Sequence, residues 1–474
     1  MTMTAPRVSE GPPGDLTPAP RRVPAPVPRW WRDASGVTGW ALLVAVTCLW
    51  VVHGGLGDFG SLGDGLTAAG RLCGLLASAL LLIQVLLMAR IPWFEQAWGQ
   101  DELARTHRLV GLTSFNLMLA HIVLVVLGYA ASSNLGLWST VWNLAVNYPG
   151  MLLGIAGTAA LAMVVVTSVR KARARLRYES WHLIHLYGYL GAGLALPHQL
   201  WTGRDLTASP VATWFWWTLY AVAAGSVLVF RIAVPLVRSL RAPLRVVEVR
   251  HDATDVTTVT VAGRGVRRIR AHGGQFFQWR LLDGPGWTRA HPYSLSAAPD
   301  GRSLRFTAAH VGDGTSRLAT LQPGARVLVE GPYGRLHQGV RTRRKVLLMA
   351  SGIGITPMRA LLEDLQQAPG DVTVIHRVRS ADSAVLADEL SGLAAARGAR
   401  YHLVSGPRIP GRDTWLPVGA QHLSDTAALR HLVPDVADHD AYLCGSPGWM
   451  DAARAALAAA GVPAQNIHHE RFTY

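Results

Sequence analysis

Five histidines stand in two apolar stretches of the amino-terminal half of the chain. His107 and His121 lie in THRLVGLTSFNLMLAH, and His182, His185 and His198 lie in ESWHLIHLYGYLGAGLALPHQLW. An imidazole among apolar residues loses its hydration and needs a partner. On an α-helix, His107 and His121 fall about 40° apart on one face and about 21 Å apart along the axis. This spacing predicts two stacked ligand sites.

The second stretch supplies partners at similar depths. Four imidazoles on two neighbouring helices can hold two bis-histidine haems, an arrangement suited to electron transfer. His198 lies thirteen residues after His185, about 220° away on an ideal helix, but Pro197 permits a local distortion. We prefer His185 to His182 as the inner ligand. The alternative is that these histidines are hydrogen-bonded packing residues or a proton path. The candidate haem ligands are His107, His121, His185 and His198.

A second group of candidate residues suits a flavin. In RAHPYSLSAAP, residues 289–299, a Tyr can cover an aromatic ring system, while Ser and His side chains offer hydrogen bonds to a ribityl or phosphate group. In HVGDGTSRL, residues 310–318, glycines flank polar residues whose backbone N–H groups suit a diphosphate. By itself each stretch also reads as ordinary sheet and loop. The candidates are His291, Pro292, Tyr293, Ser294, Ser296, Gly314, Thr315 and Ser316.

A third group predicts a nucleotide site. RKVLLMASGIGITPMRALLEDL reads as a buried strand over 345–350, a glycine-rich turn over 351–356 and a helix with Pro357 at its first position. Gly352 and Gly354 would let a diphosphate approach the helix N-terminus. The strand DVTVIHRV follows, and then AYLCGSPGWM, where another strand ends at Cys444. The further candidates on these loops are Thr356, Gly445, Arg377 and Arg379.

The donor follows from the end of strand 371–378. Arg377 and Arg379 stand where NAD-selective folds commonly place an acidic residue on the ribose, and Arg can pair with a 2′-phosphate. We therefore expect NADPH, with NADH possible. The alternative is a solvated basic turn.

The elements that position these residues divide the chain in two. The chain has 474 residues, 50% hydrophobic and 16% charged. Up to about residue 237 it reads as apolar runs of about 20 residues, the length that crosses a bilayer. The six predicted spans are roughly 37–56, 67–90, 109–130, 149–169, 181–200 and 211–234. Beyond them, period-two strands predict a small antiparallel barrel, and alternating strands and helices predict a parallel doubly wound sheet.

Charge and cysteine content limit the function. The net charge is +15, but much of it flanks the apolar runs, as in the positive-inside pattern, so we do not expect nucleic-acid binding. Loops after the second, fourth and sixth spans carry most Arg and Lys, which places both termini in the cytoplasm of a multi-pass cell-membrane protein. Arg105 and Arg108 suit haem propionates or simple anchoring. Three cysteines without a Cys-x-x-Cys pair argue against an iron–sulfur cluster, a structural zinc site and a disulfide framework. Residues 1–28 read as a disordered tail, not a signal peptide.

Residues 101–200 resemble the ferric reductase-like transmembrane domain shared by NADPH oxidases, ferric reductases and related haem b membrane proteins. Members of that group carry histidine pairs thirteen or fourteen residues apart on the third and fifth of six spans. The resemblance implies that His107 and His185 bind an inner haem b, and that His121 and His198 bind an outer one.

Residues 244–474 resemble the ferredoxin–NADP reductase superfamily. HPYSLS is similar to its flavin motif, SGIGITP to its nucleotide diphosphate loop, CGSP to its nicotinamide-side loop and ERFTY to its C-terminal aromatic tail. Soluble relatives often have Arg before the flavin Tyr, whereas His291-Pro292 is closer to the NADPH oxidase version. The resemblance implies FAD and a stacking aromatic that gates the nicotinamide, with Phe472 first and Tyr474 second. It also implies a role for Cys444 beside the nicotinamide.

We therefore expect a six-helix membrane bundle (36–240) after a tail (1–35), then a FAD-binding β-barrel (241–340) and an α/β NAD(P)-binding domain (341–474). The expected function is transmembrane electron transfer from cytoplasmic NAD(P)H through FAD and two haems to a small acceptor outside, with ferric iron favoured and oxygen next. The alternative is a proton-conducting or anchoring membrane domain fused to a flavin reductase without haem. The sequence does not indicate the oligomeric state.

Overall fold

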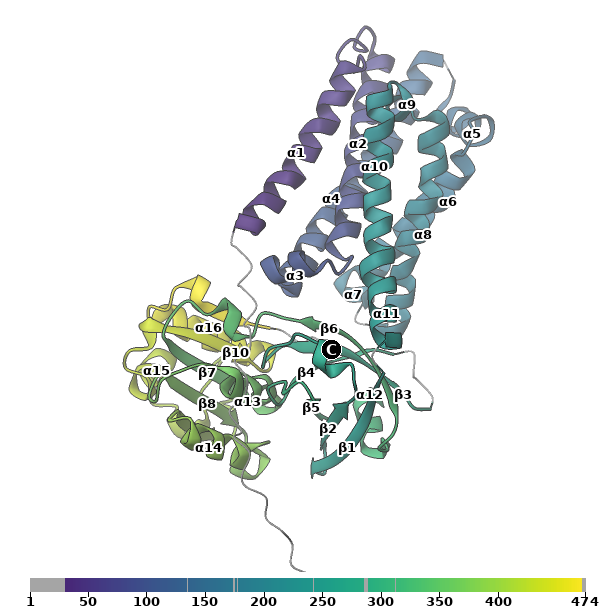
Figure 1. Ribbon diagram of the computed structural model, residues 1–474. Coiled ribbons are helices and arrows are strands. Elements are labelled where there is room, and N and C mark those ends of the chain that lie inside the picture. Colours follow the sequence, from purple (N-terminus) through teal and green to yellow (C-terminus); the bar gives the residue numbers. More distant parts are fainter. Residues whose placement is uncertain are drawn as a thin grey trace, which may run out of the picture.

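The computed structural model describes residues 30–133, 135–173, 175–176, 178–241, 243–284, 289–311 and 313–470. Its amino-terminal half is a bundle of long helices, and its carboxy-terminal half holds two sheets that lie below the bundle in Figure 1. The change from helices to sheets falls between α11 (Val234–Arg241) and β1 (Leu244–Ala253). The predicted division into a helical half and a sheet-containing half is confirmed, while the exact domain limits stay predictions.

Six long helices build the bundle: α1 (Trp30–Val52), α2 (Leu62–Leu87), α4 (Gln100–Ser133), α6 (Met151–Ser168), α8 (Tyr178–Thr202) and α10 (Pro210–Ser226). Among the described residues, five stretches are long and apolar enough to cross a membrane: Trp30–Val52, Leu62–Leu87, Glu102–Ser133, Met151–Ser168 and Pro210–Arg241. The predicted span 181–200 is α8, whose histidines and Gln199 lower its hydropathy. Several apolar helices are thus present, and the count of six spans stays a prediction.

Segments between the long helices that were expected to be loops contain short helices. α10 continues through a π-helix, η1 (Val227–Ala233), into α11. The short helix α3 (Pro92–Trp98) follows α2, and α5 (Leu137–Asn147) follows α4. Two four-residue helices, α7 (Arg170–Arg173) and α9 (Arg204–Thr207), lie on either side of α8. Residues 30–35, expected in the disordered tail, form the first turns of α1.

The long helices pack as close pairs. α2 packs along α4, and α6 packs along α8. Small residues permit the close approach: a Cβ added to Gly157 of α6 would lie 2.7 Å from the carbonyl oxygen of Gly191 in α8. Without a side chain on either residue the two backbones touch directly, as is common between helices in membranes. The histidine-bearing helices α4 and α8 therefore each have a closely fitted neighbour.

The first sheet is antiparallel, in the order β4-β3-β6-β1-β2-β5. Besides β1 it contains β2 (Val256–Ala262), β3 (Phe276–Leu282), β4 (His291–Ser294), β5 (Ser303–Ala309) and β6 (Arg326–Tyr333). Alternate side chains of β3, including Phe277 and Trp279, are fully buried in one core with Phe306 of β5. The two edge strands meet at a bridge between Leu295 and Phe306. The antiparallel arrangement is confirmed, and closure into a full barrel stays a prediction.

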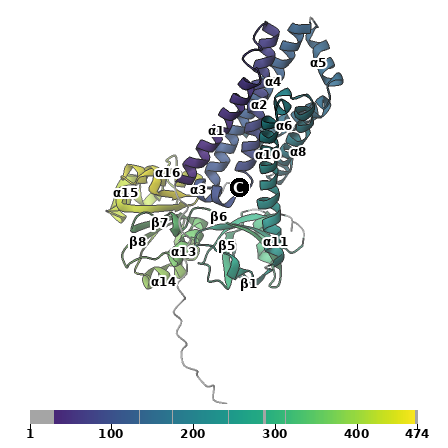
Figure 2. The same ribbon diagram turned by 45° about the horizontal axis from the view of Figure 1, so that its top comes forward.

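The second sheet is parallel, in the order β11-β10-β7-β8-β9. Its strands are β7 (Lys345–Ser351), β8 (Val372–Val378), β9 (Arg400–Ser405), β10 (His439–Cys444) and β11 (Ile467–His469). Helices α13 (Ile355–Asp364), α14 (Ala387–Ala396), α15 (Asp425–Leu432) and α16 (Pro447–Ala459) follow individual strands. Leu348 of β7 packs in the core with α13 and α14, and Leu347 packs in the core with α15 and α16. The doubly wound fold is confirmed, and Figure 2 shows both sheets beneath the bundle.

Candidate functional site

All four candidate ligand histidines line one continuous cavity inside the bundle. His107 and His121 belong to α4, and His185 and His198 belong to α8. The cavity has a volume of about 2410 Å³. A pocket for one small ligand has a volume of about 300–1,000 Å³. The cavity therefore has room for more than one large ligand.

The hydrogen bonds of these histidines define which ring nitrogen is free. Three of them place Nδ1 against a main-chain carbonyl oxygen: His107 with Gln84 (3.1 Å), His121 with Gly70 (2.8 Å) and His198 with Ala195 (2.7 Å). A carbonyl oxygen only accepts, so Nδ1 carries the hydrogen and Nε2 keeps its lone pair. An imidazole held in this way is prepared to bind a metal through Nε2.

The backbone of α2 supplies the acceptors for both histidines of α4. Gly70 and Gln84 are fourteen residues apart in α2, the same separation as His107 and His121 in α4. Because α2 and α4 pack along each other, each histidine meets a carbonyl at its own level. Glycine at position 74 also matters here, since an added Cβ would lie 2.7 Å from Nδ1 of His121.

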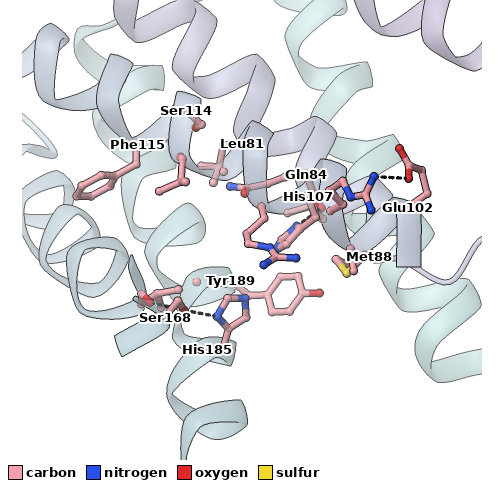
Figure 3. Close-up of a pocket in the computed structure, with 18 of the residues that line it drawn as sticks. Leu81, Gln84, Met88, Glu102, His107, Ser114, Phe115, Ser168, His185 and Tyr189 are labelled. Carbon is pink, nitrogen blue, oxygen red and sulfur yellow. Dashed lines mark hydrogen bonds and ion pairs between the residues drawn. The ribbon is translucent and has the colours of Figure 1, made fainter. Parts of the chain in front are cut away.

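At the level nearer the sheets, the structure sets His185 opposite His107. The two ring centroids are 5.9 Å apart with an interplanar angle of 62°. The Nδ1 atom of His185 lies 3.3 Å from Oγ of Ser168, as the dashed line in Figure 3 marks. In that view His185 and His107 project toward each other from facing helices. His182 also lines the cavity. The structure thus sets His185 beside His107, and the choice of His185 over His182 as the inner ligand stays a prediction.

At the level farther from the sheets, His121 and His198 line the same cavity. Pro197 lies inside α8, which continues to Thr202. A Cβ on Gly154 of α6 would lie 3.3 Å from Nδ1 of His198, so this glycine gives the imidazole room. His121 and His198, the predicted second pair, therefore line the same cavity. On an ideal helix, His185 and His198 of α8 would lie on different faces.

The described residues contain no group of three or more His, Cys, Asp or Glu side chains arranged to hold a metal ion. A haem iron takes only its axial ligands from the protein, so two imidazoles are enough. The residues present fit that group, because the imidazoles have Nδ1 engaged and face a large cavity. Haem binding stays a prediction.

The far end of the cavity carries an ion cluster that the sequence did not reveal. Arg71 of α2 binds Asp205 through two hydrogen bonds, of 2.8 and 2.6 Å, and Asp58 through a third of 2.6 Å. Arg204 also contacts Asp58 at 3.2 Å. Both Arg71 and Asp205 line the cavity. Asp205 lies 134 positions from Arg71, so no local pattern could have joined them.

The flavin motif lies on β4 and reaches the same cavity. Ser294 pairs across the sheet with Phe276 of β3, and both Phe276 and Pro292 line the cavity. The ring of Tyr293 is buried and stacks on Phe306 at 4.9 Å and on His291 at 5.9 Å. The space around the histidines is therefore continuous with the strand that carries the flavin motif.

The other flavin candidates are mostly engaged in the fold. Ser296 is fully buried, and its Oγ accepts a hydrogen bond of 2.9 Å from Thr307. Gly314, Thr315 and Ser316 lie in the short helix α12 (Asp313–Ser316). Oγ1 of Thr315 accepts a 2.9 Å hydrogen bond from the backbone N–H of Val311, which fixes the turn.

The nucleotide loop forms where two parallel strands end side by side. Gly352 has a φ of +55°, in the left-handed region, and a Cβ there would meet nothing within 4 Å. A Cβ on Gly354 would lie 2.3 Å from the carbonyl oxygen of Cys444, and one on Gly445 would lie 2.8 Å from Cβ of Ser351. Glycine at these positions therefore lets the SGIG and CGSP loops touch and leaves one side open to a ligand.

The helix after this loop begins slightly earlier than expected. α13 starts at Ile355, so Pro357 is its third residue and not its first. Proline is still tolerated there, because the N–H groups of the first turn have no partner within the helix. Oγ1 of Thr356 donates to the carbonyl of Ile353 at 3.1 Å. Burial raises the pKa of the Cys444 thiol, so it stays a neutral thiol at physiological pH.

The C-terminal segment returns to the flavin-bearing sheet. Glu470 follows β11, is buried, and accepts a hydrogen bond from the backbone N–H of Arg335 in the loop after β6. A Cβ on Gly334 would lie 2.3 Å from Oε1 of Glu470. Phe472 and Tyr474 lie outside the described residues, so the gate predicted for them stays a prediction.

Comparisons with known proteins identify two parts of the chain. Residues 73–196 match the ferric reductase like transmembrane component, and residues 348–455 match the oxidoreductase NAD-binding domain. The chain is 33% identical over 236 residues to the ferredoxin reductase component of 3-ketosteroid-9-alpha-monooxygenase from Mycolicibacterium smegmatis (48% of this chain, 63% of the relative). It is 32% identical over 211 residues to the same component from Mycobacterium tuberculosis (44% and 56%).

The chain thus spans less than two thirds of the length of those two relatives. It is 29% identical over 221 residues to ferredoxin–NADP reductase B of Sorangium cellulosum (43% of this chain, 88% of the relative). Among solved structures, the FAD/NAD-binding domain of nitric oxide dioxygenase from Vibrio cholerae shares 24% identity, with a TM-score of 0.39, over 48% of this chain and 98% of that one. The chain therefore combines a ferric reductase-like transmembrane domain with a reductase module of the ferredoxin–NADP reductase type.

Proposed function

We propose that this protein is a membrane flavocytochrome b that carries electrons from NAD(P)H to an acceptor on the opposite side of the membrane. FAD supplies the conversion of a two-electron hydride donor into single electrons, and haem iron supplies one-electron transfer. The acceptor is a small molecule, with ferric iron favoured and oxygen next. The relatives named as ferredoxin reductases and the NAD-binding match support the NAD(P)H and FAD half of this proposal.

One observation carries the haem half. Two levels of imidazoles line a cavity that continues to the flavin strand, and at each level a histidine of α4 has Nδ1 committed to a carbonyl of α2. Buried packing histidines also bond Nδ1, but here the committed Nδ1 atoms leave an Nε2 available at each of two levels of a large cavity, as axial ligands require. The match of residues 73–196 to the ferric reductase like component supports the same conclusion.

The residues of the chain have distinct roles in this scheme. His107 with His185 would hold the haem nearer the sheets, and His121 with His198 the farther one. The loop Gly352–Gly354 and the start of α13 would hold the nucleotide diphosphate, because backbone N–H groups at a helix N-terminus favour anions. The ring of Tyr293, which is buried, would support FAD from within β4.

The proposed orientation places the sheets and both termini in the cytoplasm of a cell-membrane protein. Arg90 after α2 and the arginine-rich segments after α6 and α10 lie at the ends of helices that face the sheets, and Arg/Lys excess marks the cytoplasmic side. The acceptor would then bind at the end of the cavity near Arg71 and Asp205.

The experiment is the visible spectrum of the purified full chain and of four variants: His121→Ala, His198→Ala, His185→Ala and His182→Ala. We expect Soret and α bands at about two haems per chain, because each bis-histidine site binds one haem. His121→Ala and His198→Ala should each lose about half of the haem, while FAD binding and flavin reduction by NADPH remain. His182→Ala is the matched control, since it removes an imidazole from the same cavity.

A flavin-only spectrum of the wild-type chain would instead favour a proton-conducting or anchoring membrane domain. Full haem occupancy in both His121→Ala and His198→Ala would contradict the assignment of the second pair. Loss of haem in His182→Ala with full haem in His185→Ala would reverse the assignment of the first pair.

A further inference from the structure

Arg90 stands at the junction between the helical bundle and the flavin-bearing sheet. It lies between α2 and α3 with a φ of +64°, a left-handed conformation that residues other than glycine adopt rarely. Its side chain is only 14% exposed. A strained, buried arginine persists where surrounding contacts hold it, and such positions cluster at functional sites.

On the bundle side, two side chains accept hydrogen bonds from one nitrogen of the guanidinium. Nη1 of Arg90 donates to Oε1 of Glu95 in α3 at 2.7 Å and to Oε1 of Gln100 at 2.9 Å. Glu95 is itself buried, and Gln100 is the first residue of α4, the helix that carries His107. The guanidinium is therefore fixed relative to the helix that carries the nearer histidine.

On the sheet side, the same guanidinium lies over an aromatic ring of β6. Cζ of Arg90 is 4.5 Å from the centroid of the Tyr333 ring. The Tyr333 hydroxyl donates to Oε1 of Glu330 at 2.6 Å, which orients the ring. Tyr333 pairs across the sheet with Phe276, and Phe276 pairs with Ser294 of the flavin motif. This short series of contacts connects α4, the helix that carries His107, with β4, the strand that carries the flavin motif.

Two further contacts fix the loop that presents Arg90. Nη1 of Arg231, in the π-helix after α10, donates to the carbonyl of Met88 at 2.8 Å. Gly99, after α3, has a φ of +79°, and a Cβ there would lie 3.0 Å from Cδ of Arg335 in the loop after β6. Domains joined by a modest interface usually move relative to each other. A cation that lies over a ring of β6 and is hydrogen-bonded to α3 and α4 restrains that motion.

We propose that Arg90 fixes the position of the flavin-bearing sheet relative to α4, the helix that carries His107. Its role is positioning, and it rests on the proposed electron transfer from flavin to haem. The planar guanidinium is needed because it covers the ring face while its edge binds Glu95 and Gln100; a lysine ammonium retains charge but has no such plane.

The test uses the full chain in detergent with four variants: Arg90→Ala, Arg90→Lys, Tyr333→Leu and Tyr333→Phe. Rapid mixing with NADPH follows flavin absorbance and haem absorbance separately. We expect unchanged flavin reduction in all four variants. Haem reduction should slow about tenfold in Arg90→Ala and in Tyr333→Leu, the equivalent of about 1.4 kcal/mol in the activation free energy. Tyr333→Phe should stay near wild type because the ring face remains, and Arg90→Lys should fall between.

Arg344→Ala is the matched control, since that arginine is 73% exposed and pairs with Asp371, next to β8. Hydrogen exchange gives a second readout that does not depend on haem. We expect faster exchange of the backbone amide hydrogens in Arg90→Ala and Tyr333→Leu, over residues 91–99 and 326–336. In Arg344→Ala the exchange of these residues should equal that of the wild type. Wild-type haem reduction and wild-type exchange in Arg90→Ala would overturn the proposal. Absence of haem from the wild-type chain would refute the proposed function instead. The hydrogen-exchange comparison would still decide whether Arg90 fixes the sheet relative to α4.

Discussion

Arg377 and Arg379 stand two positions apart at the end of β8, yet their side chains are in opposite situations. Arg377 is buried, and its guanidinium donates to the carbonyls of Trp415 and Pro407, both at 3.2 Å, and to that of Val378. Burial and the nearby charge of Arg408 lower its pKa. Arg379 is exposed at the carboxyl edge of the sheet. The expected pair of phosphate-binding arginines therefore separates into one that fixes a loop and one open to a ligand.

We accordingly expect Arg379 to carry the preference for NADPH. A charge-assisted hydrogen bond contributes about 1.5–3 kcal/mol, so Arg379→Ala should lower kcat/KM for NADPH by about ten- to a hundredfold and leave NADH nearly unchanged. Steady-state kinetics with both donors measure this ratio. Arg400→Ala is the control, because Arg400 begins β9 at the opposite edge of the sheet. An unaltered NADPH to NADH ratio in Arg379→Ala would assign Arg379 to a solvated turn.

At the scale of elements, a charge network joins the two sheets of the reductase half. Glu389 of α14 meets three arginines: Arg250 of β1 (2.8 Å), Arg305 of β5 (2.8 Å) and Arg359 of α13 (3.2 Å). Nη2 of Arg305 also donates to the carbonyl of Ser296, the last residue of the flavin motif HPYSLS. The helix that follows the nucleotide loop is thereby tied to the flavin sheet, which helps to align the two cofactor sites.

This network predicts a pH-dependent stability. Burial opposes the charge of Glu389, but hydrogen bonds from Arg305 and Arg250 outweigh it and lower its pKa to about 2. A lowered carboxyl pKa stabilises the fold above the unfolded value of about 4.3, and this contribution is lost as the pH falls toward 2. Glu389→Gln should lower the temperature of FAD release by about 2–4 °C at pH 7, since partly exposed pairs contribute about 0.2–1 kcal/mol each.

FAD fluorescence during heating measures this difference at pH 7 and again at about pH 3, where it should shrink because part of the contribution is lost there. Glu248→Gln, at an exposed carboxylate of β1, is the control. An equal loss at both pH values would mean that packing, and not charge, accounts for the effect.

The elements differ in how far the sequence could predict them. The parallel sheet and the glycine loop follow from local patterns: a buried strand, glycines and a helix start within about twenty residues. α5 was missed although Trp138, Val141, Trp142 and Ala145 have helical spacing, because a helix of eleven residues is too short to read as a span. α8 was predicted as the span 181–200, yet it is not among the five described helices that are apolar enough to cross a membrane, because its histidines lower its hydropathy.

For the candidate site, the sequence supplied the residues and, through the family resemblance, the pairing of the histidines, but not their hydrogen-bond partners. The pairing of His107 with His185, and the Nδ1 contacts to Gln84 and Gly70, depend on how α2, α4 and α8 pack. Arg90 and Tyr333 are more than two hundred residues apart, and no local periodicity relates them. Long-range contacts of this kind arise from tertiary packing, which local patterns in a single sequence do not reveal.

At the scale of the whole molecule, one cavity extends from the ion cluster of Arg71 to the flavin strand. Its histidines lie at two levels, so electrons that enter at the sheets would leave at the far end. This geometry predicts a sided reaction. With the full chain in sealed liposomes and NADPH added outside, chains with outward-facing sheets should reduce an impermeant ferric chelate trapped inside.

His198→Ala should stop that reduction, because it removes a ligand of the farther haem, while external flavin reduction by NADPH continues. The matched control is His182→Ala, which should retain transfer. Absorbance of the trapped chelate measures the rate, and detergent lysis gives the total capacity. Equal reduction of enclosed chelate by wild type and His198→Ala would show that electrons do not pass through the farther pair, and reduction of external chelate alone would show that the bundle anchors the reductase without conducting electrons.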